Sequence, residues 1–270
     1  MTNNRFAGRR VVVIGSGFGI EGYDDIGRAS AAAFAAEGAE VAVVQVTKEY
    51  ADEAVREITD AGGHAHGFVN DPRDPQRIVV VAEEIATIWP SVDVLVTHHF
   101  ATTIANVEQT TLEQFEEALR VNLTGTFMAT KAFLPMLRSS DQASIVHAGS
   151  IDGTLGNPNI PAYSASKGGV HALVHCLAGD LSSDGIRVNG IARAGSTALP
   201  LPQKVFDELD RATPLHAAAD PTEYAAAVLF LASREASYVN GVILPVDGGR
   251  TALTPGCTPG YVGYSRNTDS

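Results

Sequence analysis

Short apolar runs rich in β-branched residues alternate with longer segments of helical period along this chain. Strands are predicted at 11–14, 40–46, 66–70, 92–96, 144–148, 186–191 and 242–246. Helices are predicted at 28–37, 48–60, 75–89, 111–137, 163–181 and 221–233, the fourth divided in two near Asn122 and Gly125. Strands separated by helices specify βαβ units, whose right-handed crossovers place helices on both faces of a parallel sheet. The pattern predicts an α/β fold with one doubly wound parallel sheet of about seven strands.

No linker, repeat or low-complexity tract divides the chain, so a single domain is expected over residues 1–250. Residues 251–270 contain two Pro-Gly pairs and little periodicity. This segment is either a disordered tail or an arm that reaches a neighbouring subunit.

Composition narrows the classes of partner. The net charge of −12, with no basic stretch to offset it, argues against a nucleic acid or an anionic membrane surface. No apolar run approaches the roughly 20 residues that span a bilayer, and the N-terminus lacks a signal-peptide core. Cys176 and Cys257 have no metal-ligand spacing, and His171 and His175 have no evident third ligand. We expect a cytoplasmic protein that takes a small-molecule substrate and holds no metal.

The strongest chemical signal is a tyrosine four residues before a lysine. Tyr163 and Lys167 share one face of the predicted helix over 163–181. An ammonium near a phenol lowers the phenol pKa from its usual value of about 10. Ser150, at the end of the adjoining strand, is placed to hydrogen-bond a substrate oxygen. Tyr-x-x-x-Lys alone fits equally well with a surface tyrosine and lysine on an ordinary helix.

The segments around this pair resemble the short-chain dehydrogenase/reductase family in order and spacing over about residues 8–250. The matching segments are Val-Asn-Leu-Thr-Gly at 121–125, Ser-Ile-Val at 144–146, Gly-Ser-Ile at 149–151, Gly153, Tyr-Ser-Ala-Ser-Lys at 163–167, Ile-Arg-Val-Asn at 186–189, Gly-Val at 241–242 and Val-Asp-Gly-Gly at 246–249. The resemblance implies a Rossmann-type fold, an NAD(P)(H) cofactor and a homodimer or homotetramer.

The resemblance also implies four catalytic roles. Tyr163 exchanges a proton with the substrate oxygen, and Ser150 orients and polarises that oxygen. Lys167 lowers the tyrosine pKa and holds the nicotinamide ribose. Asn122 holds a water in the proton relay behind Lys167.

The first glycine loop departs from the family pattern Thr-Gly-x-x-x-Gly-Ile-Gly, whose glycines let the backbone approach a pyrophosphate. In one register Gly15 and Gly19 open the motif, and Glu21 replaces its last glycine. In the other, Ile26 and Gly27 start the helix after an insertion, which fits the helix length better. Both registers place carboxylates near the pyrophosphate position, where they repel it. The loop either bulges outward or has lost the dinucleotide.

Two further positions depart from the family. Thr97-His98-His99-Phe100 stands where the family has Asn-Asn-Ala-Gly, and Arg193-Ala194 replaces a Pro-Gly that borders the nicotinamide. Large side chains at both places are expected to narrow the cofactor groove. The candidate cofactor-binding residues are Gly15, Gly19, Ile26, Gly27, Gln45, Asp71, Thr97, Tyr163 and Lys167.

The ribose position at the end of the second strand is Gln45, so no acid specifies NAD there, and Lys48 nearby is either a phosphate ligand or a solvated residue. The choice between NAD and NADP stays open.

Substrate contacts are expected from His98 and His99, and from Gly195 and Leu199 in the loop after the sixth strand. The expected function is an NAD(P)-dependent oxidoreductase that interconverts a secondary alcohol and a ketone. The alternative is a non-redox enzyme on the same fold, such as a lyase, isomerase, cyclase or halohydrin dehalogenase-like enzyme, that uses Ser150 and Tyr163 without nicotinamide turnover.

Overall fold

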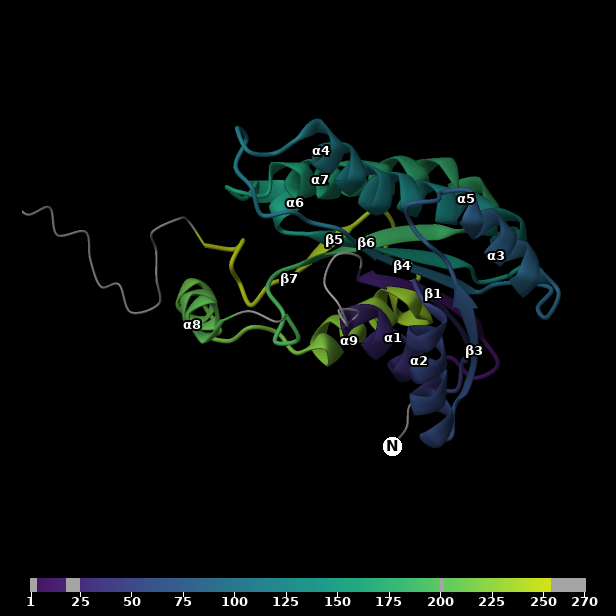
Figure 1. Cartoon of the computed structure of the whole chain (residues 1–270). Coiled ribbons are helices and arrows are strands. Elements are labelled where there is room, and N and C mark those ends of the chain that lie inside the picture. Colours follow the sequence, from purple (N-terminus) through teal and green to yellow (C-terminus); the bar gives the residue numbers. More distant parts are fainter. Residues whose placement is uncertain (1–3, 18–24, 200–201, 254–270) are drawn as a thin grey trace, which may run out of the picture.

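The seven predicted strands form one parallel sheet in the computed structural model, which describes residues 4–17, 25–199 and 202–253 (Figure 1). Their order across the sheet is β3-β2-β1-β4-β5-β6-β7, the doubly wound arrangement expected from the sequence. The strands are β1 (Arg10–Gly17), β2 (Glu40–Gln45), β3 (His64–Val69), β4 (Val94–Phe100), β5 (Ser144–Ser150), β6 (Arg187–Arg193) and β7 (Ile243–Val246).

Helices cover both faces of the sheet (Figure 1). The helices are α1 (Asp25–Ala36), α2 (Lys48–Asp60), α3 (Arg77–Ala86), α4 (Leu112–Ala118), α5 (Gly125–Arg138), α6 (Asp152–Leu155), α7 (Pro161–Asp180), α8 (Gln203–Ala212) and α9 (Pro221–Ala232). Successive strand residues point to opposite faces. Val12 and Ile14 accordingly pack in a core with α3, α5 and α7, while Val11 and Val13 pack in a second core with α1, α2 and α9.

The pairing of β1 with β4 runs further than the hydrophobic pattern predicts. The predicted strands end at residues 14 and 96, but the ladder continues to the pair Gly17↔Phe100. The pairing of β1 with β2 ends earlier, at Ile14↔Val44. Chain order reverses between β1 and β4, and ligands of doubly wound folds bind outside the strand ends at such a point. The two strands therefore stay paired as far as Phe100 at this point of the sheet.

The break predicted within 111–137 is a wide turn. A π-helical segment over Leu119–Thr124 joins α4 directly to α5. Gly125 follows it, and a Cβ there would lie 3.3 Å from the His99 ring. Turns of the π type add one residue to the helix and are frequent at functional sites. This one presents Asn122 to the carboxyl end of β4.

Two boundaries refine the predictions. Helix α1 begins at Asp25, so Ile26 and Gly27 lie in its first turn, as the second register of the glycine loop requires. Gly19 and Glu21 lie outside the described residues, as does the expected tail beyond Leu253. Helix α8 was not predicted; it has no buried residue, so its apolar positions gave no strong core signal.

Candidate active site

Ser150, Tyr163 and Lys167 lie together at the carboxyl end of the sheet. Ser150 is the last residue of β5, while Tyr163 and Lys167 lie on the first turns of α7, which starts at Pro161. Proline at this position has its fixed φ already suited to a helix and lacks an N–H that would go unpaired. All three side chains are buried, with 3%, 4% and 2% exposure. The sequence prediction that this trio forms one cluster agrees with the geometry.

The ammonium of Lys167 is bound to the main chain. Its Nζ donates to the carbonyl oxygens of His99 and Ala148, both at 2.8 Å, and lies 5.8 Å from the centre of the Tyr163 ring. Lys167 thereby ties the ends of β4 and β5 to α7. Gly153 allows this packing, since a Cβ there would lie 2.6 Å from the main-chain carbon of Lys167.

Tyr163 is enclosed by aromatic and aliphatic side chains. Its ring packs edge to face against Phe100, with centroids 5.5 Å apart. Ile160 and Leu199 complete this cluster, which brings the predicted substrate residue Leu199 to the tyrosine. The guanidinium of Arg193 covers the other ring, 4.9 Å from the centre of Phe100. Of the residues expected to narrow the cofactor groove, Phe100 thus packs on Tyr163, and Arg193 packs on Phe100.

The electrostatics differ from the sequence prediction. Burial raises the pKa of Tyr163 above its usual value of 10, whereas the sequence predicted that Lys167 would lower it. The charge of Arg193 and hydrogen bonds from Ser150 and Arg193 oppose the rise. Burial, together with the charge of Arg193, holds the pKa of Lys167 well below its usual value. The charge of Arg193 thus bears on the pKa values of both Tyr163 and Lys167.

Asn122 is fully buried and clasps the main chain just after β4. Its Oδ1 accepts from the N–H of Ala101 at 2.7 Å, and its Nδ2 donates to the Ala101 carbonyl at 2.8 Å. The Nδ2 also donates to Ser166 Oγ at 2.9 Å. These bonds hold α7 and the end of β4 in register behind the tyrosine. The water-holding role implied by the family resemblance stays a prediction.

The structure does not bring His99 to the tyrosine. Its ring packs on Gly125 and its Nδ1 lies 3.3 Å from Thr126 Oγ1, within the core under α5. Burial lowers its pKa from 6.5 to about 3, so the side chain is neutral. His98 is also buried, and burial with the charge of Arg193 holds its pKa well below the usual value. The roles in substrate binding predicted for His98 and His99 stay predictions.

The candidate cofactor residues fall in two places. Gln45 is buried at the end of β2, and Ile26, in the first turn of α1, is buried in the core between α1 and the sheet. Asp71 is bound by Arg73, which holds the pKa of that carboxyl below its usual value. The hydroxyl of Thr97 is instead hydrogen-bonded to His147 Nδ1 inside the core, at 2.7 Å.

Lys48 pairs with Asp52 on the exposed face of α2, at 2.5 Å. This arrangement matches the solvated alternative for Lys48.

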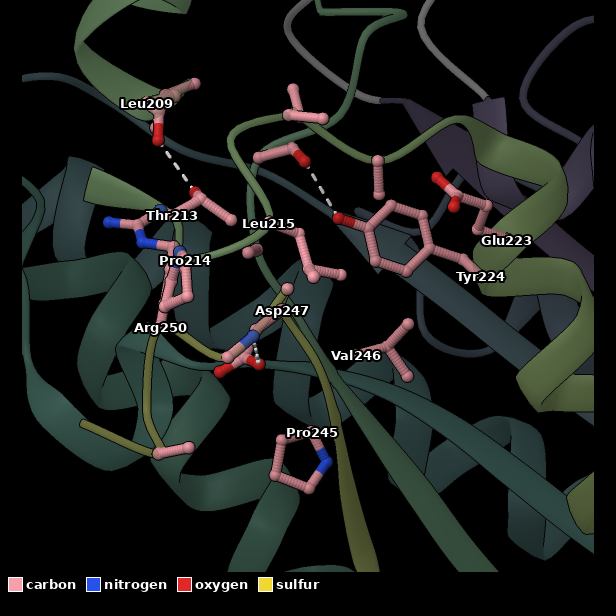
Figure 2. A pocket seen from close by; sticks show the side chains of 18 of the residues that line it. Leu209, Thr213, Pro214, Leu215, Glu223, Tyr224, Pro245, Val246, Asp247 and Arg250 are labelled. Carbon is pink, nitrogen blue, oxygen red and sulfur yellow. Dashed lines mark hydrogen bonds between the residues drawn. The ribbon is translucent and has the colours of Figure 1, made fainter. Parts of the chain in front are cut away.

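Gly195 lies in the wall of a large cavity rather than against the tyrosine. The cavity of about 610 Å³ opens between the loop after β6, the start of α9 and the segment after β7 (Figure 2). The carbonyl of Gly195 accepts a hydrogen bond from the Tyr224 hydroxyl at 2.8 Å (Figure 2). Leu209 of α8 leaves no room for a side chain at Gly195, because a Cβ there would lie 2.9 Å from it. The cavity is thus adjacent to Arg193 in sequence but does not include the catalytic trio.

Three neighbours of the site were absent from the predicted site residues. The sequence indicates Phe100 and Arg193 only as departures from the family pattern, and it carries no signal for Asp152. Asp152 Oδ2 lies 3.3 Å from Ser150 Oγ, and its N–H donates to that oxygen at 3.1 Å. Arg193 could have been found from the strand ends, because β5 and β6 both finish at the residues that pair, Ser150↔Arg193.

The comparisons with known proteins agree with this geometry. Residues 19–251 match the family model described as enoyl-(acyl carrier protein) reductase. A 3-oxoacyl-[acyl-carrier-protein] reductase from Thermotoga maritima is 33% identical, over 91% of this chain and 98% of that protein. A cyclopentanol dehydrogenase from a Comamonas strain is 35% identical, over 81% of this chain and 89% of that protein.

A solved structure from Beutenbergia cavernae, provisionally named an NAD(P)-dependent gluconate 5-dehydrogenase and holding NADP at low occupancy, superimposes with a TM-score of 0.84. It is 33% identical and covers 93% of this chain and 100% of that chain. The chain belongs to the short-chain dehydrogenase/reductase family. Membership confirms the fold and the oxidoreductase class expected from the sequence.

Membrane-spanning helices and clusters of metal ligands are both absent from the part of the chain that the structure describes. Among these residues no helix has the length and apolarity needed to cross a membrane. Within the same ranges no three His, Cys, Asp or Glu side chains gather in a way that would hold a metal ion.

Proposed function

We propose that this short-chain dehydrogenase/reductase interconverts a secondary alcohol and a ketone with NAD(P) as the hydride carrier, and that Tyr163 is the acid/base. The observation that carries the proposal is the buried cluster of Ser150, Tyr163 and Lys167 at the carboxyl end of the sheet, with Lys167 Nζ 5.8 Å from the centre of the Tyr163 ring. The relative named cyclopentanol dehydrogenase supports the substrate class, since cyclopentanol is a secondary alcohol.

The residues present fit a dinucleotide at three points. Lys167 has three donors, and in the described part of the chain two of them bind carbonyls, which leaves one for a ribose hydroxyl. Helix α1 begins at Asp25, just after the first glycine loop, and a helix N-terminus favours phosphate. Asn70 follows β3, is 4% exposed, and has an Oδ1 with no hydrogen-bond partner among the described residues. It offers an acceptor to an adenine amine.

A bound nicotinamide would supply the hydride acceptor for alcohol oxidation. The protein's own groups move the proton. Ser150 holds the substrate oxygen beside Tyr163, and the Tyr163 hydroxyl gives or takes the proton at that oxygen. Asn122 keeps the strand end and α7 in position by clasping Ala101. Proton transfer of this kind contributes typically 10²–10⁴-fold to the rate.

One observation favours the non-redox alternative. Tyr163 is only 4% exposed, because Phe100 and Leu199 pack on it where the family has a glycine at the first of these positions. A nicotinamide ring reaches the tyrosine only after Phe100 shifts. An enzyme that uses Ser150 and Tyr163 for lyase or isomerase chemistry needs less room.

Ligand binding separates the two functions. The purified protein is titrated with NADH and with NADPH, and the melting temperature is recorded. A ligand that binds the folded state raises the unfolding free energy by about 2.7 kcal/mol at 100 times its Kd. Binding of either form, followed by alcohol-dependent formation of reduced cofactor across a panel of cyclic and acyclic secondary alcohols, supports the oxidoreductase. No shift with either at millimolar concentration favours the non-redox enzyme.

A further inference from the structure

Asp152 lies beside the serine to which the proposed function assigns the substrate oxygen. Its Oδ2 accepts a hydrogen bond from Ser150 Oγ at 3.3 Å, and its N–H donates to the same Oγ at 3.1 Å. Strand β5 ends at Ser150, and α6 begins two residues later at Asp152. The end of the strand and the start of the short helix therefore place this carboxylate next to the reacting centre.

The carboxylate is oriented by neutral partners only. Its Oδ1 accepts from Asn157 Nδ2 at 3.2 Å, and its Oδ2 accepts from Ser150. Within the described ranges, Asp152 forms no ion pair with Lys, Arg or His. An ionised carboxylate has about four acceptor positions, and side chains of the described residues use two of them. The half-buried carboxylate thus keeps its charge and can accept a further donor.

The hydrogen bond from Ser150 to Asp152 is long. Bonds between a hydroxyl and an oxygen acceptor usually measure about 2.5–3.0 Å in proteins, whereas this one measures 3.3 Å. A donor on a bound substrate can replace it with a shorter bond to the charged oxygen. The Ser150 hydroxyl is then free to donate its proton to the reacting oxygen. Ser150 and Asp152 therefore form a pair that receives two neighbouring groups of one molecule.

The spacing of this pair matches a particular substrate class. Two oxygens on adjacent carbons are separated by roughly the length of a hydrogen bond, as are Ser150 Oγ and Asp152 Oδ2 at 3.3 Å. A substrate whose reacting oxygen is bound by Ser150 brings a hydroxyl on the next carbon within reach of Asp152. A methyl group at the same place removes water from the carboxylate and offers no donor in return, which costs free energy.

We propose that Asp152 is a substrate-binding residue that selects alcohols with a hydrogen-bond donor, a hydroxyl or an ammonium, on the carbon next to the reacting one. This inference rests on the proposed function and names its substrate class, vicinal diols and amino alcohols. The reacting carbon passes a hydride to oxidised NAD(P) and its hydroxyl passes a proton to Tyr163. The diol becomes a hydroxy ketone, and the group bound by Asp152 is not consumed.

The test uses three alcohols of nearly the same shape. In 3-methyl-2-butanol, 2,3-butanediol and 3-amino-2-butanol, the carbon next to the carbinol carries a methyl, a hydroxyl and an ammonium group respectively. The value of kcat/KM is measured for each stereoisomer with the wild type, Asp152→Ala and Asp152→Asn. Binding of the same alcohols is measured separately by saturation-transfer NMR without turnover. Asp180→Ala is the matched control, because Asp180 is exposed at the far end of α7.

The wild type is expected to prefer the diol over 3-methyl-2-butanol by about tenfold, as a hydrogen bond to a charged group provides. Asp152→Ala keeps the N–H that holds Ser150, so it should lose this preference without losing kcat/KM for 3-methyl-2-butanol. Asp152→Asn keeps an acceptor but loses the charge, so the ratio of amino alcohol to diol should fall. Asp180→Ala should leave every ratio unchanged.

A wild-type preference below about threefold overturns the proposal, since it corresponds to less than one net hydrogen bond. An equal loss of kcat/KM for all three alcohols in Asp152→Ala also overturns it, because a purely structural role has that effect. Should Asp152→Ala fail to fold, Asp152→Asn decides, and an unchanged ratio of amino alcohol to diol contradicts the proposal.

Failure of the proposed function is recognised separately. If no alcohol of the panel is oxidised with either dinucleotide, the binding measurements decide the role of Asp152. Tighter binding of the diol than of 3-methyl-2-butanol by the wild type, lost in Asp152→Ala, supports the selection. Equal binding of the two alcohols by the wild type overturns it.

Discussion

The ring of Phe100 closes over that of Tyr163, edge to face, with centroids 5.5 Å apart. The family pattern Asn-Asn-Ala-Gly has glycine at the position of Phe100. The contact makes the catalytic tyrosine part of a small hydrophobic cluster with Ile160 and Leu199. The space in front of the acid/base is therefore governed by one aromatic side chain.

Phe100→Ala is expected to bind the dinucleotide about tenfold more tightly. A tenfold change in Kd corresponds to about 1.4 kcal/mol, which is a modest part of the free energy needed to displace a packed ring. The same change removes a buried ring and lowers the unfolding free energy by about 3–5 kcal/mol. Calorimetric titration with NADPH and NADH measures the first effect, and denaturant unfolding the second. Phe100→Leu provides a milder variant if the alanine protein is too unstable.

Phe133→Leu is the control for this pair of variants. Phe133 is equally buried but lies on α5 in the core, away from the tyrosine. It should lose stability without gaining affinity. Equal affinity in Phe100→Ala and the wild type would mean that the ring does not obstruct the nicotinamide.

Tyr163→Phe is expected to lower kcat by at least 10²–10⁴-fold, because it removes the proton donor and leaves the ring packing unchanged. Its far-UV circular dichroism should match that of the wild type. Residual activity within tenfold of wild type would exclude Tyr163 as the acid/base. Tyr50→Phe, on the outer helix α2, is the matched loss of a hydroxyl outside the site.

Gly149→Ala is expected to cost about 1–3 kcal/mol of stability, typical of overpacking in a tight core. A Cβ there would lie 2.7 Å from His171 Cδ2 and 3.0 Å from the Ile191 carbonyl. Removing the imidazole relieves the first clash, so the double variant with His171→Ala should be more stable than the sum of the single changes by about 0.5 kcal/mol or more. Additive free energies from denaturant unfolding would show that His171 is not the obstacle.

Stability is expected to fall as the pH drops below 6.5. Burial lowers the pKa values of His99 and His147 to about 3 in the folded protein. The unfolded chain therefore binds these protons first, and the stability due to each neutral imidazole is complete above pH 6.5 and is lost as the pH falls towards 3. Each group contributes a slope of about 1.4 kcal/mol per pH unit in that window.

His147→Gln should reduce that slope by the contribution of one histidine, roughly 1.4 kcal/mol per pH unit. Denaturant unfolding between pH 4.5 and 7 measures the slope. His175→Gln, at an exposed position of α7, should leave it unchanged. Identical slopes in the two variants would contradict the assignment of acid sensitivity to the buried imidazoles.

The order of elements was predictable because each strand carries its own signal. Val11 to Ile14 and Val94 to Val96 are apolar runs of strand length, and the helices between strands show clear periodicity. The Ser150, Tyr163 and Lys167 cluster was predictable for a related reason. Strand ends and the first turns of helices are local features, and a parallel sheet gathers them at one edge.

The filling of the site was not predictable from local pattern. The contact of Phe100 with Tyr163 joins segments more than 60 residues apart in the sequence. Neither segment carries a local sequence pattern that predicts this contact. The direction of the Tyr163 pKa also depended on burial, which the spacing of Tyr163 and Lys167 does not report. Helix α8 escaped prediction because it is short and none of its residues is fully buried.

The long ladder between β1 and β4 changes where anions are received. The backbone N–H groups of residues 15–17 that point towards β4 already take part in the strand pairing, which continues to Gly17↔Phe100. Among the described residues, the backbone N–H groups that remain for a phosphate near this point are those at the start of α1, from Asp25 to Gly27.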